Sequence, residues 1–539
     1  MLSITMSRKI FLICIFTTLI TSECFAQSSP QEPTIAELRK QMDEMRTQMA
    51  QMQERIAELE SARGTSARTS TADPIPPPSA APPALQLRSD ETQKPKEPTS
   101  IQFKGLTLTP GGFLEGTMLV RTRNENADIA NNYSAIPLDG STNARLTEFR
   151  GTARNSEFSL MVQGAAGSAN LEGYVETDFL GAAPTANYVE SNSWTPRLRQ
   201  LWVQLAWASG WTITAGQMWS LLTTNEKGIA TLAELRPRTV DGQYVVGFTW
   251  TRQRAFRVTK NFNNKAWAAF SVEEPETTYS AAFVPANIMG LNTSQNASTG
   301  VNLLPFLPNY SNGFATELAP DLLAKVAFEP RWGHFEIKAL GRLFRDRIAS
   351  TATTNGHTNI SEGYGIGFGA LMPLANKKLE VPLEGLFGQG IGRYGTSGLP
   401  DATLNPISGA LRPLREAKIM GGLLYHRSSR LDLYTYGGDE YAGRDAFVSP
   451  TGTAAGYGSP LVSYTGCMNE VALNSCSGAN RNIYEVTAGY WYRLFGGEFG
   501  RIEQGNQLVY IHRNLWSGVG RTPQGSDIVA YTSLRFYLP

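Results

Sequence analysis

The sequence predicts an all-β fold, a transmembrane antiparallel β-barrel, with an α-helical coiled coil before it. Two observations lead to this prediction. Between about residues 113 and 538, apolar side chains alternate with polar or charged ones at a period of two. A secretory signal precedes this region, and no later segment holds the roughly 18 uncharged apolar residues of a transmembrane helix. A barrel with lipid outside and water inside needs strands with two such unlike faces.

Residues 1–26 are expected to form a signal peptide. Two basic residues precede the apolar run Ile10–Ile20, and the small residues in Cys24–Ala26 suit cleavage after Ala26. The alternative is an uncleaved membrane anchor. The apolar run is too short for that role, because a helix needs about 20 residues to span a bilayer.

Residues 34–61 are expected to form a coiled coil. Apolar side chains alternate there at spacings of three and four on an otherwise polar helix, and Thr34 with Glu37 fits a capping box. A narrow apolar seam needs a partner, so self-association is expected, and the alternative is packing on the barrel. Methionine is flexible and specifies oligomer number poorly, so dimer and trimer both remain open. The seam consists of Ile35, Leu38, Met42, Met45, Met49, Met52, Ile56 and Leu59.

Residues 62–100 are expected to form a linker. The run P-I-P-P-P-S-A-A-P-P at Pro74–Pro83 cannot build a core and favours an extended, fairly stiff chain. The barrel is therefore expected over residues 101–539.

The two-faced pattern is clearest in N-L-E-G-Y-V-E-T-D-F-L-G at residues 170–181. Leu171, Val175 and Phe179 fall on one face, and three carboxylates fall on the other. Similar runs recur along the chain and often end in Trp or Tyr, as the aromatic girdles of a membrane barrel do. At roughly ten residues per strand, about sixteen strands are expected, with about eighteen as the alternative. A barrel of that size leaves an aqueous lumen.

Charged side chains with inward parity are the candidate pore-lining residues, because a sealed core would not tolerate so much charge. Opposed acidic and basic rows across a water-filled channel would select permeants. The alternative is that most of these charges are solvated and have no selective role. Arg252 and Arg254 have the opposite parity to Arg257, so this basic cluster does not share one face. The candidates are Glu172, Glu176, Asp178, Arg252, Arg254, Arg257, Lys325, Lys338, Arg342 and Arg535.

Cys467 and Cys476 are expected to form a disulfide. They remain after removal of the signal, in a loop-like stretch and an oxidising compartment. A bridge that closes a loop of about ten residues is worth roughly 2–3 kcal/mol. The alternative is two free thiols.

Several function classes are disfavoured. The net charge of +1, without a basic run interleaved with aromatic residues, does not suggest a nucleic-acid partner. None of the four histidines stands at metal-ligand spacing, and no G-x-S-x-G elbow occurs, so no metal, cofactor or enzymatic activity is expected.

Four segments resemble the DcaP-like porins. They are Gly105–Gly116, Val175–Gly181, A-G-Q-M-W-S at Ala215–Ser220 and V-D-G-Q-Y-V-V-G at Val240–Gly247. The order of signal, coiled coil, Pro-rich linker and barrel matches as well. The chain departs from the usual end of such proteins, because it closes on Pro539 instead of Phe.

The resemblance implies a homotrimeric outer-membrane channel of a Gram-negative-type bacterium, joined by its barrels and by the coiled coil in the periplasm. It also implies uptake of small anionic solutes, including dicarboxylates. The expected function is therefore a porin, a water-filled diffusion channel for small hydrophilic anions. The alternative is a structural tether that links the outer membrane to the cell wall through the coiled coil.

Overall fold

The computed structural model describes the chain from residue 100 onward, with gaps. The described residues are 100–125, 127–181, 196–280, 288–289, 291–292, 313–468, 470 and 478–539. The predicted signal peptide and coiled coil, the predicted linker up to residue 99, and Cys476 lie outside these ranges and stay predictions. No helix within these ranges has the length and apolar character needed to cross a membrane.

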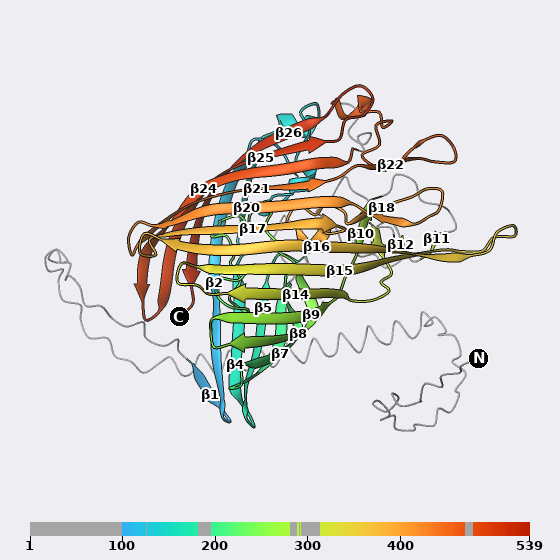
Figure 1. Cartoon of the computed structure of the whole chain (residues 1–539). Coiled ribbons are helices and arrows are strands. Elements are labelled where there is room, and N and C mark those ends of the chain that lie inside the picture. Colours follow the sequence, from blue (N-terminus) through green and yellow to red (C-terminus); the bar gives the residue numbers. More distant parts are fainter. Residues whose placement is uncertain are drawn as a thin grey trace, which may run out of the picture. The chain divides into compact units, whose positions relative to one another are not determined.

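Sixteen antiparallel strands form one closed β-barrel (Figure 1), which confirms the predicted fold class and strand number. The barrel closes at β2 (Leu106–Arg121), which pairs with β4 (Glu157–Ala166) on one side and with β26 (Gln524–Tyr537) on the other. The other strands are β5 (Ala169–Asp178), β6 (Arg197–Trp207), β7 (Trp211–Trp219), β8 (Arg252–Phe262), β9 (Ala266–Glu273), β14 (Asp321–Phe328), β15 (His334–Ile348), β16 (His357–Leu374), β17 (Leu379–Gln389), β20 (Arg415–His426), β21 (Leu431–Ala442), β24 (Asn480–Gly497) and β25 (Gly500–Leu515).

Short elements lie beside the barrel strands or in the connections between them. One of them, β3 (Glu148–Thr152), pairs with the second half of β2. The others are β1 (Ile101–Phe103), β10 (Thr278–Ser280), β11 (Ile288–Met289), β12 (Leu291–Asn292), β13 (Gly313–Ala315), β18 (Ala402–Leu404), β19 (Leu411–Pro413), β22 (Asp445–Val448), β23 (Ala454–Tyr457) and the 3₁₀ turns η1 (Tyr133–Ala135), η2 (Thr142–Arg145), η4 (Gly392–Tyr394) and η5 (Thr465–Met468).

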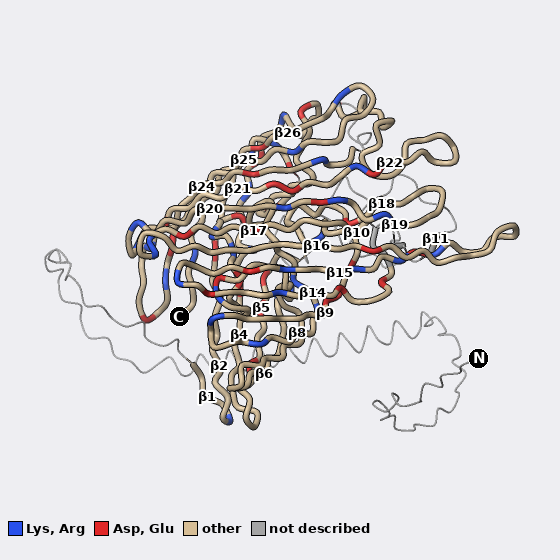
Figure 2. Tube along the Cα trace, viewed as in Figure 1, with Lys and Arg blue, Asp and Glu red and all other residues tan. Residues whose placement is uncertain are grey.

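The two faces of the wall differ as the alternation predicts. On β15, Ile337 points outward and is 54% exposed, whereas Glu336 and Lys338 point inward and are at most 2% exposed. Charged residues recur along the strands themselves as well as in the connections (Figure 2). The apolar face of the sheet is therefore outside, and the charged face is inside.

Connections are short at one end of the barrel, here called the turn side, and mostly long at the other, the loop side. Residues 263–265 join β8 to β9, for example, whereas residues 220–251 join β7 to β8. This alternation of short turns and long loops is typical of membrane β-barrels. The long connection after β21 begins at residue 443, because β21 continues to Ala442. Tyr436 belongs to this strand, and its hydroxyl accepts a hydrogen bond from the Arg238 backbone N–H at 3.2 Å.

The long connection of residues 220–251, here called the inward segment, folds into the lumen. Most of its apolar side chains are buried, among them Leu222, Val246 and Phe248 at 0% exposure. Leu221 and Leu222 pack with Trp267, Leu323 and other residues of the wall in one hydrophobic cluster. Part of the lumen is thus filled with a dry core and not with water.

Side chains of the wall bind the backbone of the inward segment. Irregular backbone inside a barrel has no ladder partners, so its N–H and C=O groups need side chains. Oxygens of inward-facing Glu and Gln side chains accept these N–H groups. The pairs are Glu273 with Leu221 (2.8 Å), Glu336 with Asn225 (3.2 Å), Gln507 with Val240 (2.6 Å), Glu485 with Val246 (2.9 Å), Glu440 with Gly247 (2.9 Å) and Glu384 with Thr249 (2.8 Å).

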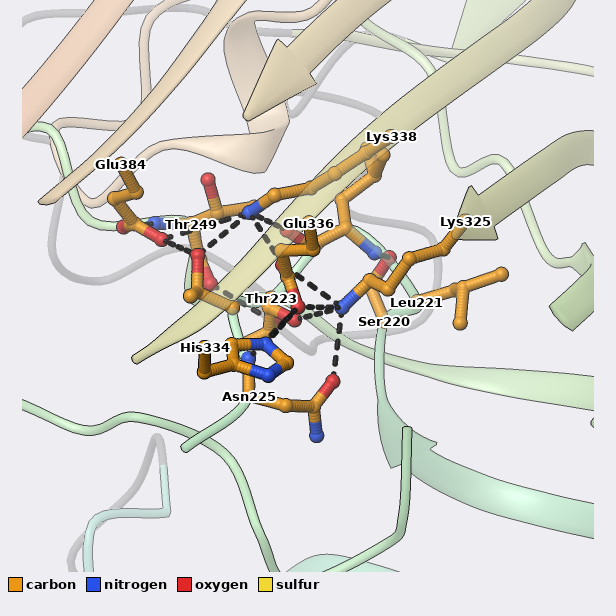
Figure 3. Close-up of polar contacts among 12 residues, drawn as sticks. Ser220, Leu221, Thr223, Asn225, Thr249, Lys325, His334, Glu336, Lys338 and Glu384 are labelled. Carbon is orange, nitrogen blue, oxygen red and sulfur yellow. Dashed lines mark hydrogen bonds and ion pairs between the residues drawn. The ribbon is translucent and has the colours of Figure 1, made fainter. Parts of the chain in front are cut away.

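Two lysines complete this attachment (Figure 3). Lys325 Nζ donates to the Thr223 carbonyl and Lys338 Nζ to the Leu222 carbonyl, both at 2.6 Å. Glu336 lies between them, with Oε1 at 3.1 Å from Lys325 Nζ and 3.3 Å from Lys338 Nζ. Each cation is thus paired and hydrogen-bonded, as a buried charge must be.

One glycine of the wall, Gly438, makes room for the backbone of the inward segment. A Cβ on Gly438 would lie 1.8 Å from the Val246 carbonyl oxygen, closer than any real Cβ contact. Any larger residue at this position would push the inward segment away from β21.

We predict that Lys338→Met loosens the inward segment. The substitution removes the donor to the Leu222 carbonyl and leaves Glu336 and Glu384 with less compensation, and breaking a buried pair costs about 3–5 kcal/mol. Urea unfolding in detergent micelles should show that the free energy of unfolding falls by about this amount. Trypsin should also cleave faster after the exposed Lys227 of the inward segment.

Lys378→Met, at an exposed position in a turn, is the control and should behave as wild type. Equal unfolding curves and equal cleavage rates for the two variants would contradict the anchoring role of Lys338.

Candidate functional site

Two cavities remain beside the inward segment. The loop-side cavity has a volume of about 370 Å³, and the turn-side cavity has about 460 Å³. Leu180, Arg199 and Gly242 line both. The two cavities therefore adjoin at these residues, and together they are here called the passage.

Arginines outnumber carboxylates in the lining of both cavities. The loop-side cavity is lined by Arg154, Arg197, Arg199, Arg252 and Arg393 with Asp128 and Glu276, and the turn-side cavity by Arg199, Arg236, Arg238, Arg501 and Arg535 with Glu157, Glu226, Glu234 and Asp241.

Most of these arginines are held by carboxylates that lie behind them. Arg197 Nη2 and Arg199 Nη1 lie 2.6 and 2.8 Å from the same Asp178 oxygen, and the Asp178 side chain is fully buried. Arg535 Nη2 likewise lies 3.0 Å from a buried oxygen of Glu115. Charge-assisted hydrogen bonds of this kind fix the guanidinium groups in place. At these positions the guanidinium group of each pair lines a cavity, although each pair is close to neutral.

Arg199 lines both cavities, at the place where they adjoin. Its Nε lies 2.5 Å from Glu176 Oε1 and 3.2 Å from Glu157 Oε2, and its Nη2 donates to the Tyr244 hydroxyl at 3.4 Å. Tyr244 belongs to the inward segment, so this arginine connects the wall to that segment at the junction of the cavities.

A β-bulge explains the inward direction of Arg199. Glu176 pairs with Gln200, and Thr177 pairs with Leu198, which leaves Arg199 as an extra residue on β6. Arg199 and Gln200 are consequently both buried. Simple alternation from Gln200 would place Arg199 outside, so the sequence pattern missed it. Bulges commonly re-aim a side chain beside a functional site.

The predicted acidic row on β5 lies beside arginines and does not stand alone across the lumen. Glu176 and Asp178 contact Arg199 and Arg197 of the neighbouring strand. Glu172 accepts hydrogen bonds from two glutamines of the adjacent strands, at 3.1 and 2.9 Å. The predicted acidic residues thus hold neighbouring side chains.

The predicted basic residues divide into two groups. Arg252 lines the loop-side cavity and Arg535 the turn-side cavity. Lys325 and Lys338 hold the inward segment, and Arg257 donates to the carbonyl of Trp219, the last residue of β7, at 2.6 Å.

Two further predicted arginines lie apart from both groups. Arg342 is buried and donates to the Gly390 carbonyl and to Asp401, at 2.5 and 2.8 Å, so it fixes the connection after β17. Arg254 is exposed and pairs with Glu274 and Glu276.

Several lining arginines were not among the sequence candidates. Arg236 and Arg238 lie in R-P-R, inside the inward segment that no strand pattern marks as luminal. The others are Arg154, Arg197, Arg199, Arg393 and Arg501. The paired arginines in P-R-L-R at the start of β6 were the one available signal, because their alternation matches a strand.

Two buried carboxyl groups of the inward segment titrate unusually. Burial raises the pKa of Asp241 to about 6, against an opposing hydrogen bond from the Gln243 N–H at 2.8 Å. Burial also raises the pKa of Glu234. The negative charge of the turn-side cavity therefore depends on pH near neutrality.

Two further predicted features lie away from the passage. Cys467 is buried and disulfide-bonded, whereas its predicted partner Cys476 lies outside the described residues. Within the described part of the chain, no group of three or more His, Cys, Asp or Glu side chains is arranged to hold a metal ion.

No protein-family model and no curated protein matches this chain. Among solved structures, the outer membrane channel DcaP of Acinetobacter baumannii is similar at 13% identity and a TM-score of 0.55, over 81% of this chain and 99% of that chain. OprB of Pseudomonas putida (11% identity, 80% and 94% of the two chains, TM-score 0.43) and an anion-selective porin from Comamonas acidovorans (10%, 80% and 100%, 0.42) are less similar. The first similarity shows a shared fold and confirms, at that level, the resemblance to DcaP-like porins predicted from the sequence.

Proposed function

We propose that the protein is an outer-membrane porin, a water-filled diffusion channel for small hydrophilic anions. The closed barrel supports this proposal, because its outer face is apolar and its inner face is charged. The two cavities that meet at Arg199 supply the path.

The arginine lining of the passage is the observation that carries anion preference. Guanidinium groups face the cavities, while buried carboxylates such as Asp178 hold them from behind. Arg236 is exposed in the turn-side cavity, and no ion pair to it occurs among the described residues. Charges on narrow walls of low dielectric raise the local concentration of counter-ions. Small anions should therefore enter this passage more readily than cations of equal size.

The assembly belongs to the same proposal. Three barrels would associate in the outer membrane, with the coiled coil of residues 34–61 joining them in the periplasm and the Cys467–Cys476 disulfide closing an external loop. The coiled-coil seam in the sequence supports self-association.

We predict that Arg236→Gln lowers the chloride-to-potassium permeability ratio by about fivefold, since the loss of one lumen charge is worth roughly 1 kcal/mol at an intermediate dielectric. Reversal potentials of the full-length protein in planar bilayers, under a KCl gradient, measure this ratio. The wild-type channel should have a reversal potential of the sign expected for an anion-selective channel.

Lys227→Gln is the matched control, because Lys227 is exposed on the same inward segment and does not line either cavity. A wild-type channel that prefers potassium, or a wild-type protein that never conducts, would reject the proposal.

We predict that anion selectivity rises as the pH falls from 7 to 5. Asp241 has a pKa of about 6, so it gains a proton over this range and loses its negative charge, while the arginines keep theirs. Reversal potentials at the two pH values report the change. Asp241→Asn lacks this carboxyl group and should respond less to pH. Equal responses of wild type and variant would show that Asp241 does not govern the effect.

A further inference from the structure

The loop-side cavity contains polar groups that have no partner. Arg252 Nη1 and the hydroxyls of Thr251 and Ser397 are buried and make no hydrogen bond to the described residues. All three residues line this one cavity. A buried polar group without a partner costs about 1–3 kcal/mol, so such groups favour a ligand that satisfies them.

Arg252 is also the uncompensated cation of this cavity. Four other lining arginines have carboxylate partners, as Arg393 has in Glu276 at 3.0 Å and Arg154 in Asp128 at 2.7 Å. No ion pair to Arg252 occurs within the described ranges. The positive charge of Arg252 is therefore available to pair with one anionic group of a ligand.

Aromatic side chains hold the Arg252 guanidinium in a fixed position. Its central carbon lies 4.8 Å from the ring centroid of Trp219 and 5.8 Å from that of Trp250. Trp219 is fully buried, and Trp250 Nε1 donates to the Gly395 carbonyl at 2.7 Å. A cation stacked in this way keeps its N–H groups available in its plane and loses little freedom when it binds an anion.

The remaining wall of the cavity has apolar surface. Trp250, Leu180 and Leu399 contribute to it, close to the polar groups described above. A volume of about 370 Å³ suits a small molecule. A fully hydrated inorganic anion would satisfy Arg252 but would leave this apolar surface wet.

We propose that the loop-side cavity binds solutes with one anionic oxyacid group and an apolar ring, such as aryl carboxylates or sulfonates. The oxyanion accepts hydrogen bonds from the Arg252 guanidinium, and the ring packs against Trp250 and Leu399. A second anionic group finds no free cation there, because the other arginines are paired. This inference deepens the proposed porin function and rests on it.

The test compares benzoate with acetate, which carries the same charge without the ring. Each anion is titrated against the chloride current of the full-length protein in planar bilayers. Benzoate should block at a concentration at least about tenfold lower than acetate, since burial of the ring removes apolar surface from water. Arg252→Gln should weaken the benzoate block by about tenfold, and Arg252→Lys should weaken it less, since a charge remains.

Arg254→Gln is the matched control, with the same charge change two residues along β8, at a side chain that is 62% exposed and does not line the cavity. Equal block by benzoate and acetate, or an undiminished benzoate block in Arg252→Gln, would overturn the inference. If benzene-1,4-dicarboxylate blocked the channel at a tenfold lower concentration than benzoate, the inferred preference for solutes with one anionic group would be wrong.

Two readouts separate this inference from the proposed function. Reversal potentials in KCl without benzoate test the anion channel alone. Quenching of tryptophan fluorescence by benzoate reports occupancy near Trp219 and Trp250 even where no current flows. A chloride-selective channel that shows neither block nor quenching would retain the function and reject the site.

Discussion

The need to satisfy irregular backbone inside a barrel shapes this molecule more than any other constraint. Residues 220–251 lie in no strand of the barrel, so the buried N–H and C=O groups that find no backbone partner need a side chain of the wall. Glu440, Glu485 and Gln507 accept N–H groups at 2.6–2.9 Å, and Lys325 and Lys338 donate to carbonyls at 2.6 Å. Charged side chains in the lumen are therefore needed to bind the backbone of the inward segment, whatever solute passes.

This constraint divides the luminal charges by location. On β14, β15 and β17 they bind the inward segment, and the hydrophobic cluster around Leu222 and Trp267 fills the space between. On β4 and β6, Glu157 and Arg199 border the cavities instead, although Arg199 also contacts the inward segment through the Tyr244 hydroxyl. The passage is consequently off centre, and inward parity alone does not make a residue pore-lining.

The division also marks how far the sequence can predict the structure. Alternation places Lys338, Glu336 and Arg342 inside correctly, because each residue's direction is a local property of the strand. What these side chains meet depends on residues 220–251, whose buried Val245 and Phe248 read like the apolar run of another strand. The bulge at Arg199 depends on the register of two strands, which no single-strand pattern reveals. The face to which a strand's side chains point is thus predictable, but the position of Arg199 between the two cavities is not.

The arginine lining shows why net charge says little about selectivity in a protein of this kind. The chain carries a net charge of only +1. Arginine has a long side chain and a planar head with several donors, so it can bind a carboxylate at one edge and present another edge to water. Asp178 and Glu115 are short and lie against the wall, behind Arg197 and Arg535. A solute in the passage therefore meets the guanidinium group of such a pair before its carboxylate, whose effect is weaker at the greater distance. In these pairs the order of the two charges along the radius of the barrel, and not their number, determines which charge faces the cavities.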